Sequence, residues 1–175
     1  MHVAAISGTV GPSARTNALL ELALDAARVR GGTAVLLDLQ RDGIDWCDGR
    51  DPATYGTTTV AAIDAVRAAD AIVVGTPVYR GSYSGRLKNF FDLIPSDLLA
   101  GKPALLVAAG ASLEHRLAID TALRPLLAQF AAHVLPQSVY STPEDFVDGQ
   151  ATDAVRERVA AAAGALCDLA ARLGA

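Results

Sequence analysis

The chain has 175 residues, a length that fits one domain with a two-faced core, so we expect a single domain over residues 1–175. Its net charge of −4 argues against a nucleic-acid surface, and no apolar run reaches the roughly 20 residues that a membrane span needs, although 51% of the residues are hydrophobic. The two cysteines, Cys47 and Cys167, lie far apart and form no CxxC pair, so neither a metal site nor a redox dithiol is indicated.

Five short apolar runs alternate with helical patterns along the chain. The runs are continuous, as in strands covered on both faces, and lie at residues 3–6, 34–37, 71–74, 104–107 and, more weakly, 134–140. Apolar residues three and four apart indicate helices near residues 19–27, 61–66, 85–93, 117–130 and 155–173. This alternation predicts a three-layer α/β domain with a parallel sheet. No basic segment precedes the first run, so we expect no signal peptide and a cytoplasmic protein.

The loop after the first run, residues 7–17, has the composition of a phosphate site. Its small and hydroxyl residues let backbone N–H groups converge, and the positive end of the following helix points at them. Arg15 adds a forked cation suited to phosphate. The alternative is an ordinary βα turn in which Thr16 or Asn17 caps the helix. The position after the first strand favours the phosphate site.

The same loops argue against three other kinds of site. The first loop lacks GxxxxGK[ST], so no lysine is placed for nucleoside triphosphate cleavage, and it lacks the GxGxxG dinucleotide fingerprint. The later stretch from Gly81 to Gly85 resembles a nucleophile elbow only in its glycines, because its central residue is Tyr83. Residues 42–59 form the one long irregular stretch, and a loop of that length is usually functional or interfacial.

The third apolar run leads into the most specific motif of the chain. The stretch reads Pro77-Val78-Tyr79-Arg80-Gly81-Ser82-Tyr83-Ser84-Gly85-Arg86-Leu87-Lys88-Asn89. It resembles the signature Pro-x-Tyr-x-x-Ser-x-x-Gly-x-Leu-Lys-Asn of the NAD(P)H-dependent FMN reductases. The first loop is similar to that family's Gly-Ser-x-x-x-x-x-Ser-Arg-Thr loop, with Thr9 in place of the first serine and Ala14 in place of the second. The substitution at Ala14 removes one hydroxyl donor. The resemblance covers almost the whole chain.

The resemblance implies a flavodoxin-like sheet of strand order 2-1-3-4-5, in which the loops after strands one, three and four meet at one edge. It implies that these loops bind FMN. The expected FMN-binding residues are Thr9, Arg15, Thr16 and Asn17 in the first loop, Pro77, Val78, Tyr79, Arg80 and Ser82 in the second, and Gly110, Ala111 and Ser112 in the third.

For several side chains of these loops and of the following helix, a structural or surface role remains open as the alternative to ligand contact. The Tyr79 ring can pack on its own loop, Arg80 can be a solvated charge, and His115 suits a cap or the surface. Leu87, Phe90 and Phe91 suit either the helix core or a subunit contact. Lys88 and Asp92, four residues apart, can form a surface ion pair.

The resemblance implies an enzyme that transfers hydride from NADPH or NADH to FMN. Because the flavin carries the chemistry, no catalytic acid or base and no metal is expected. Reduced flavin would pass to a partner monooxygenase, to oxygen, or to a quinone or azo acceptor. A non-enzymatic electron carrier of the flavodoxin kind is the alternative on the same fold, but the modest charge and the Arg-bearing first loop favour the reductase. No 2′-phosphate site is identifiable, so NADPH and NADH both remain open.

Two segments resemble the alkanesulfonate-type FMN reductases in particular, Asp38-Leu39 and the stretch 117–127. Those reductases tend to carry Tyr or His at the position of Thr121, on a widened helix turn linked to flavin release. A β-branched residue fits an ordinary helix, so we expect a regular helix here and FMN held as a prosthetic group. A neutral surface role for Thr121 is the alternative. The apolar bulk of Phe90, Phe91 and the turn at Pro95 predicts a homo-oligomer, a dimer or more specifically a homotetramer.

Overall fold

The structure, a computed structural model, describes residues 1–11 and 14–174. Its centre is a five-stranded parallel sheet of order β2-β1-β3-β4-β5. The strands are β1 (His2–Ser7), β2 (Thr33–Asp38), β3 (Ala71–Pro77), β4 (Pro103–Ala109) and β5 (His133–Ser141). The predicted fold class and strand order, those of the flavodoxin-like fold, are confirmed.

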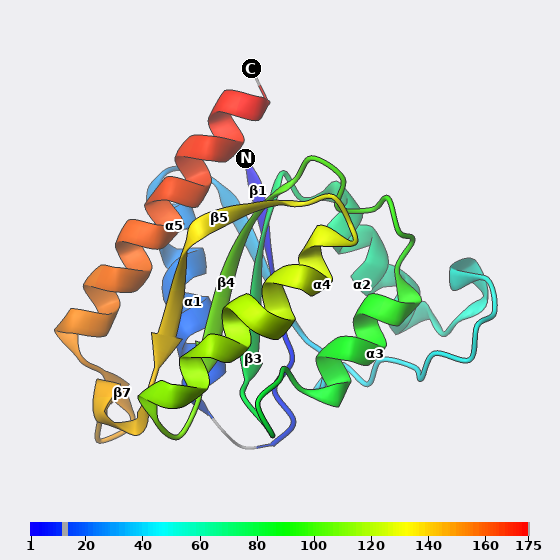
Figure 1. The fold of residues 1–175 in the computed structure, drawn as a ribbon. Helices are drawn as coiled ribbons and strands as arrows, with labels where there is room; N and C mark the ends of the chain where they lie inside the picture. Colours follow the sequence, from blue (N-terminus) through cyan, green and yellow to red (C-terminus); the bar gives the residue numbers. More distant parts are fainter. Residues whose placement is uncertain (12–13, 175) are drawn as a thin grey trace.

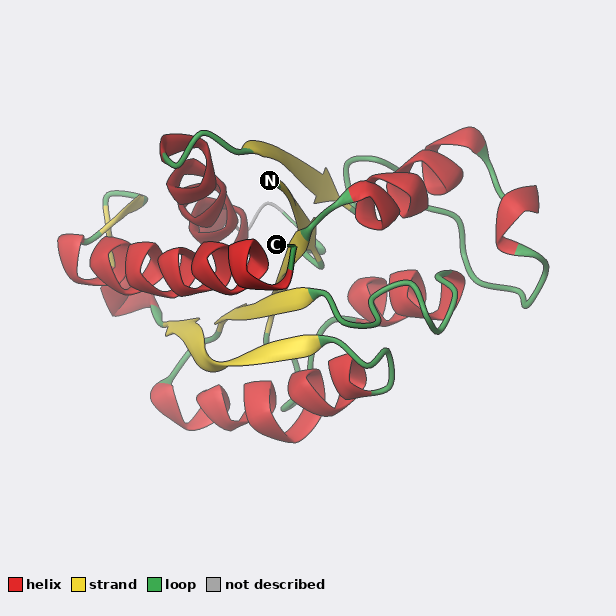
Figure 2. Cartoon of the chain, turned by 90° about the horizontal axis from the view of Figure 1, so that it is seen from above, coloured by secondary structure: helices red, strands yellow, loops and turns green. Residues whose placement is uncertain are grey.

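Helices cover both faces of the sheet (Figures 1 and 2). One face carries α1 (Ala14–Val29) and α5 (Asp153–Leu173), and the other carries α2 (Thr57–Ala68), α3 (Gly85–Leu93) and α4 (Arg124–Ala128). Successive strand residues serve opposite faces, so Ile72 and Val74 belong to one core cluster while Ala71 and Val73 belong to the other. This explains why the strand runs are apolar without interruption.

Helix α3 follows the signature loop and is well determined by its sequence. The Ser84 hydroxyl accepts the Leu87 N–H at 3.1 Å, as an N-cap should. Phe90 and Phe91 are buried, and the Phe91 ring lies 5.4 Å from the Phe130 ring, centroid to centroid. These aromatics are therefore core residues, and the expectation that their bulk marks a subunit contact is wrong. The predicted surface pair is confirmed, with Lys88 Nζ 2.5 Å from an Asp92 carboxylate oxygen.

The segment after β4 departs from the predicted regular helix. It consists of a 3₁₀ turn (Leu113–Arg116), a π-helical turn (Ile119–Leu123) and α4. The Arg124 N–H donates to the Ile119 carbonyl, a bond that spans five residues instead of four. The expectation of an ordinary helix at Thr121 is thus wrong.

The physical reason is the proline that follows the turn. Pro125 has no N–H for the Thr121 carbonyl, and in a regular helix its ring would press against that carbonyl. The wider turn avoids this contact. The Thr121 hydroxyl donates to the Leu117 carbonyl at 2.8 Å, so this exposed side chain is bonded to the preceding turn of its own helical segment.

The long irregular stretch between β2 and α2 is held in place by hydrogen bonds. The Asn89 carboxamide accepts the Cys47 N–H at 2.8 Å and donates to the Asp45 carbonyl at 2.7 Å. The Asp45 carboxylate accepts from the Thr59 hydroxyl at 2.7 Å. Trp46, by contrast, is 65% exposed. Asn89 of the signature therefore has a structural role.

A small β-hairpin separates β5 from α5 and was not predicted. Its strands are β6 (Phe146–Val147) and β7 (Gln150–Ala151), and Asp148 and Gly149 between them both have positive φ. Among the described residues, no helix is long and apolar enough to cross a membrane.

Candidate functional site

The first loop joins β1 to α1 at the carboxyl edge of the sheet, the lower edge in Figure 1. Helix α1 begins at Ala14, so Thr16 and Asn17 lie inside its first turn, and the alternative that one of them is the N-cap is wrong. Thr9 and Thr16 are buried, and Arg15 is partly buried. Pro12 and Ser13 of the same loop lie outside the described residues.

Thr16 is the most informative side chain of this loop. Its hydroxyl oxygen is buried and has no hydrogen-bond partner among the described residues. Most buried hydroxyls are paired, because burying one without a partner costs free energy. It stands in the first turn of a helix, where backbone N–H groups also lack intrahelical partners. The turn can therefore donate hydrogen bonds to an anion.

A network of polar side chains lies beside Thr16. The Asn17 amide nitrogen donates to Asp38 Oδ2 at 2.8 Å, and Asn17 Oδ1 accepts from the Ser7 hydroxyl at 2.5 Å and the Thr9 hydroxyl at 3.3 Å. Asp38 ends β2 and pairs with Ser7 in the strand register. Asp38 was not among the predicted site residues. It could have been found from the expectation that β1 and β2 end side by side, which places Asp38 next to Ser7.

The second loop, which follows β3, is bonded directly to the first. The Ser84 hydroxyl donates to the Gly8 carbonyl at 2.5 Å, and the Gly8 N–H donates to the Gly75 carbonyl at 2.8 Å. A Cβ on Gly8 would lie 2.7 Å from the Leu87 Cβ, so only glycine allows this approach. Ser84 thus both caps α3 and fixes the spacing of the two loops.

A tight turn forms the tip of the second loop. Tyr79 and Ser82 exchange backbone hydrogen bonds of 2.9 and 3.0 Å, and Arg80 and Gly81 between them have φ values of 52° and 78°. Two left-handed residues in sequence are the pattern of a type I′ turn. This conformation is unfavourable for Arg80, and such residues cluster at functional sites. Tyr79 is 48% exposed, and the Val78 N–H donates to the Ala109 carbonyl.

The third loop follows β4 and contacts the first. The Arg15 guanidinium donates to the Gly110 carbonyl at 3.3 Å, and the Tyr140 hydroxyl donates to the Ser112 carbonyl at 2.7 Å. A Cβ on Gly110 would lie 1.9 Å from the Tyr140 hydroxyl oxygen, so any side chain there would have to displace the Tyr140 hydroxyl from its position. Burial raises the pKa of Tyr140, which keeps its hydroxyl protonated as a donor. Tyr140 was missed from the sequence because it comes from a different strand.

The predicted residues are therefore brought together by the fold. Those of the first loop, Pro77 to Ser82 of the second and Gly110 to Ser112 of the third all lie at one edge of the sheet. Contacts between the loops join them into one surface. Whether each side chain touches a ligand stays a prediction.

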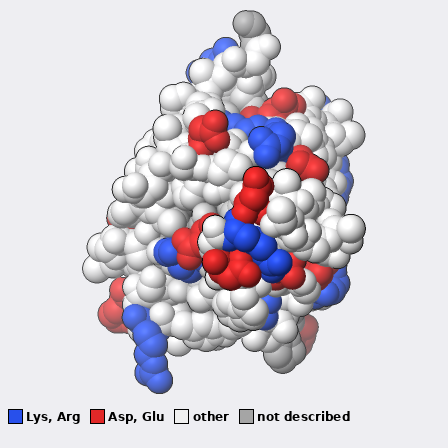
Figure 3. Space-filling model, turned by 90° about the vertical axis from the view of Figure 1, so that its right-hand side faces the viewer, with Lys and Arg blue, Asp and Glu red and all other residues white. Residues whose placement is uncertain are grey.

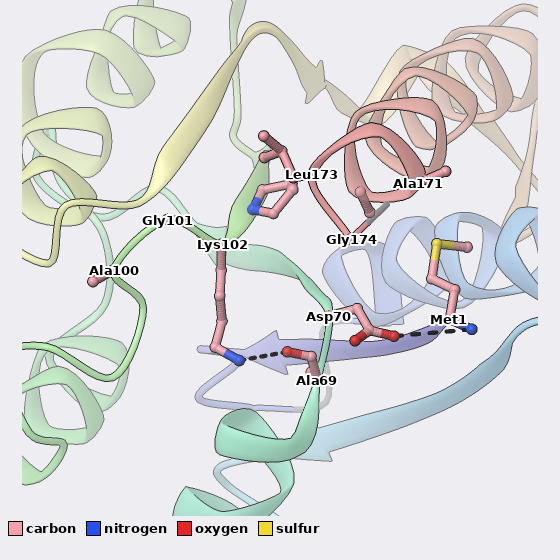
Figure 4. Close-up of a pocket in the computed structure, with 11 residues that line it drawn as sticks. Met1, Ala69, Asp70, Ala100, Gly101, Lys102, Ala171, Leu173 and Gly174 are labelled. Carbon is pink, nitrogen blue, oxygen red and sulfur yellow. Dashed lines mark hydrogen bonds and ion pairs between the residues drawn. The ribbon is translucent and has the colours of Figure 1, made fainter.

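A separate pocket of about 590 Å³ lies at the opposite edge of the sheet (Figure 4). Its charged groups are engaged within the fold. The Lys102 ammonium donates to the Arg67 carbonyl at 2.9 Å and the Ala69 carbonyl at 2.5 Å, at the C-terminal end of α2. Burial lowers the pKa of Lys102, and Asp70 lies 3.9 Å from the Met1 ammonium. These groups stabilise the edge, and the three loops are remote from them.

Comparison with known proteins is consistent with the geometry of the loops. The family model described as NADPH-dependent FMN reductase matches residues 1–147. The chain is 37% identical over 163 residues to the NAD(P)H-dependent FAD/FMN reductase of Geobacillus thermodenitrificans, covering 91% of this chain and 88% of that protein. It is 36% identical over 151 residues to the NADH-dependent FMN reductase SfnF of Pseudomonas putida, covering 83% and 80%.

A solved structure agrees as well. The apo form of the NADH:FMN oxidoreductase EMOB superposes with a TM-score of 0.80 at 30% identity, covering 94% of this chain and 87% of that one. The resemblance inferred from the signature is confirmed by these matches.

Proposed function

Since the chain belongs to the family of NADPH-dependent FMN reductases, we propose that the three loops at the carboxyl edge of its sheet bind FMN for reduction by a nicotinamide nucleotide. The chain is an oxidoreductase that uses FMN and a nicotinamide nucleotide. The observation that carries the placement is the buried hydroxyl of Thr16 in the first turn of α1, which has no hydrogen-bond partner in the described part of the chain. A phosphate group would supply the missing acceptor.

The residues of the first loop fit the phosphate of FMN. Arg15 carries the positive charge, the Thr16 hydroxyl is a free donor among the described residues, and the first turn of α1 adds backbone N–H groups. When bound, FMN would accept the hydride of the nicotinamide, and the chain's own residues hold, orient and shield the reactants.

The second and third loops fit the flavin ring. Pro77, Val78, Tyr79, Arg80 and Ser82 would border one edge of the ring and the ribityl chain. Gly110, Ala111 and Ser112 would border the other. Backbone groups suit this role, because hydrogen bonds fix the backbone of the Tyr79–Ser82 turn and of the Gly110 region. Thr9 and Asn17 would support the phosphate end from beneath, because their side chains bond to each other and to Ser7 and Asp38.

The wider setting is proposed from the same family resemblance. The chain would act as one FMN-binding domain in the cytoplasm, as a homo-oligomer, and a flavin-dependent monooxygenase would accept its reduced flavin. A flavodoxin-type carrier would be expected to have a strongly acidic face for docking. On the side shown in Figure 3, acidic and basic side chains are mixed, and the net charge of the chain is only −4, which supports the reductase.

Steady-state kinetics test this function. The purified chain is mixed with NADH or NADPH, and nucleotide oxidation is followed with and without added FMN. The expected result is catalytic oxidation that depends on FMN, with one nucleotide preferred. A single stoichiometric reduction without turnover would instead identify an electron carrier, and failure to bind FMN would remove the proposed site.

A further inference from the structure

The end of β2 contributes a buried carboxylate to the floor of the first loop. Asp38 is 8% exposed, and both of its carboxylate oxygens accept hydrogen bonds. Oδ1 accepts the backbone N–H groups of Gln40 and Arg41, each at 3.1 Å. Oδ2 accepts the side-chain amide of Asn17 at 2.8 Å. The carboxylate thus joins the turn after β2 to the first turn of α1.

The chemistry of Asp38 determines which way the Asn17 carboxamide faces. An ionised carboxylate only accepts hydrogen bonds, so the nitrogen end of the carboxamide must face Asp38. The oxygen end then faces the hydroxyls of Ser7 and Thr9, which donate to it. The direction of donation through the whole network follows from the charge of Asp38.

This direction has a consequence for the neighbouring anion site. With Ser7 and Thr9 turned toward Asn17, the network is satisfied internally and holds the β1–α1 loop in one conformation. Thr16 takes no part in these hydrogen bonds. The network therefore does not engage the Thr16 hydroxyl, which is buried beside it without a partner among the described residues.

We propose that Asp38 is a positioning residue for the FMN phosphate, acting through Asn17 to fix the first loop. This inference rests on the proposed FMN site. Asp38 itself makes no contact with the phosphate in this proposal. Its negative charge even opposes phosphate binding, so its contribution must come through geometry.

The variant Asp38→Asn separates geometry from charge. An asparagine has one accepting end, so it cannot serve both the backbone N–H groups and Asn17. Keeping the two backbone bonds turns its nitrogen toward Asn17, which must flip and reverse the network. We expect FMN affinity to fall about tenfold and riboflavin affinity to stay within about twofold. If Asp38 acted only through Coulomb repulsion of the phosphate, the same variant would bind FMN more tightly, because a negative charge is removed.

Flavin affinities are measured by fluorescence titration with FMN and with riboflavin, which lacks the phosphate. Asp42→Asn is the matched control, because it removes a negative charge on the same turn. Asp42 Oδ2 accepts the Asp38 N–H, a bond that an amide oxygen can keep, and among the described residues Oδ1 accepts only from the exposed Arg41 guanidinium. We expect its preference for FMN over riboflavin to equal that of the unmodified chain. If Asp38→Asn does not fold, Asp38→Ser replaces it, because a serine oxygen still accepts from the turn but does not reach Asn17.

A double-variant cycle tests the route through Asn17. In an Asn17→Ala background, Asp38→Asn should no longer change the preference for FMN over riboflavin. An unchanged preference in Asp38→Asn alone, tighter FMN binding, or a full effect that persists without Asn17 would each overturn the inference. If the unmodified chain does not prefer FMN to riboflavin, the proposed phosphate site itself fails, which is a distinct result.

Discussion

At the scale of single residues, Arg15 supplies the one side-chain cation of the first turn of α1, and its guanidinium donates to the Gly110 carbonyl at 3.3 Å. We expect Arg15→Ala to remove a charge-assisted contact worth roughly 1.5–3 kcal/mol, about ten- to a hundredfold in FMN affinity. Riboflavin affinity should barely change, because riboflavin has no phosphate. Titration with both flavins measures this. An equal loss of affinity for both flavins would show that Arg15 holds the loops together and does not bind the phosphate.

For Thr16 we expect ligand affinity and stability to respond differently to substitution, because its hydroxyl is buried without a partner among the described residues. Replacing it by the isosteric Thr16→Val should leave the free energy of unfolding of the ligand-free chain unchanged or raise it by up to about 1 kcal/mol. FMN affinity should fall about five- to tenfold. Denaturant unfolding without flavin and fluorescence titration with FMN measure the two effects.

The matched control for Thr16→Val is Thr59→Val. Thr59 is also a buried threonine near the start of a helix, but its hydroxyl donates to Asp45 Oδ2 and accepts the Asp45 N–H. Here the same change should cost about 1–3 kcal/mol of stability and leave FMN affinity unaltered. A loss of stability in Thr16→Val as large as in Thr59→Val would mean that the Thr16 hydroxyl already has a partner within the fold.

At the scale of elements, Asn89 links α3 to the irregular segment between β2 and α2. Asn89→Ala removes two hydrogen bonds to backbone groups and should lower the free energy of unfolding by about 1–3 kcal/mol. Trypsin should then cut faster at Arg50, which lies in the released segment. The control is Lys88→Ala on the same helix, whose exposed pair with Asp92 should contribute at most roughly 0.5 kcal/mol. Equal protease resistance in both variants would refute this role.

Sequence patterns predicted these elements well where packing follows local periodicity. The continuous runs gave the strands because both faces are covered, and the signature gave α3 because its cap and apolar spacing are local. The turn around Thr121 was mispredicted, because the side chain at 121 suits a helix while the constraint comes from Pro125, four residues later. The expectation that FMN is held as a prosthetic group had relied on a regular helix there, and the widened turn removes that support.

Other features were out of reach because they join distant parts of the chain. The weak run around Pro136 is a single strand with a register shift, and the Arg124 guanidinium donates to the Leu135 carbonyl at 2.7 Å beside the shift. The partnership of Asp38 with Asn17 depends on β1 and β2 ending side by side. A sequence gives the residue types of such a network but not its pairings.

At the scale of the whole molecule, the exposed apolar side chains indicate where copies of the chain would contact one another. Phe90 and Phe91 are core residues, so they give no reason to expect an interface. Other large apolar side chains are exposed instead: Trp46 at 65%, Leu113 at 62% and Leu117 at 60%. Leu113 and Leu117 lie one turn apart on the segment after β4, next to the proposed flavin site. Apolar side chains grouped in this way are typical of contact surfaces.

We therefore predict that the chain forms a homo-oligomer, and more specifically a homotetramer, through the surface that contains Leu113 and Leu117. Light scattering at micromolar concentration should give a mass well above that of one chain. Leu117→Asp should reduce this mass, because a charge buried in an apolar contact is costly. Val29→Asp is the control, since Val29 is 88% exposed at the far end of α1, and it should leave the mass unchanged. A monomeric unmodified chain would contradict the prediction, and an unchanged mass in Leu117→Asp would place the contact elsewhere.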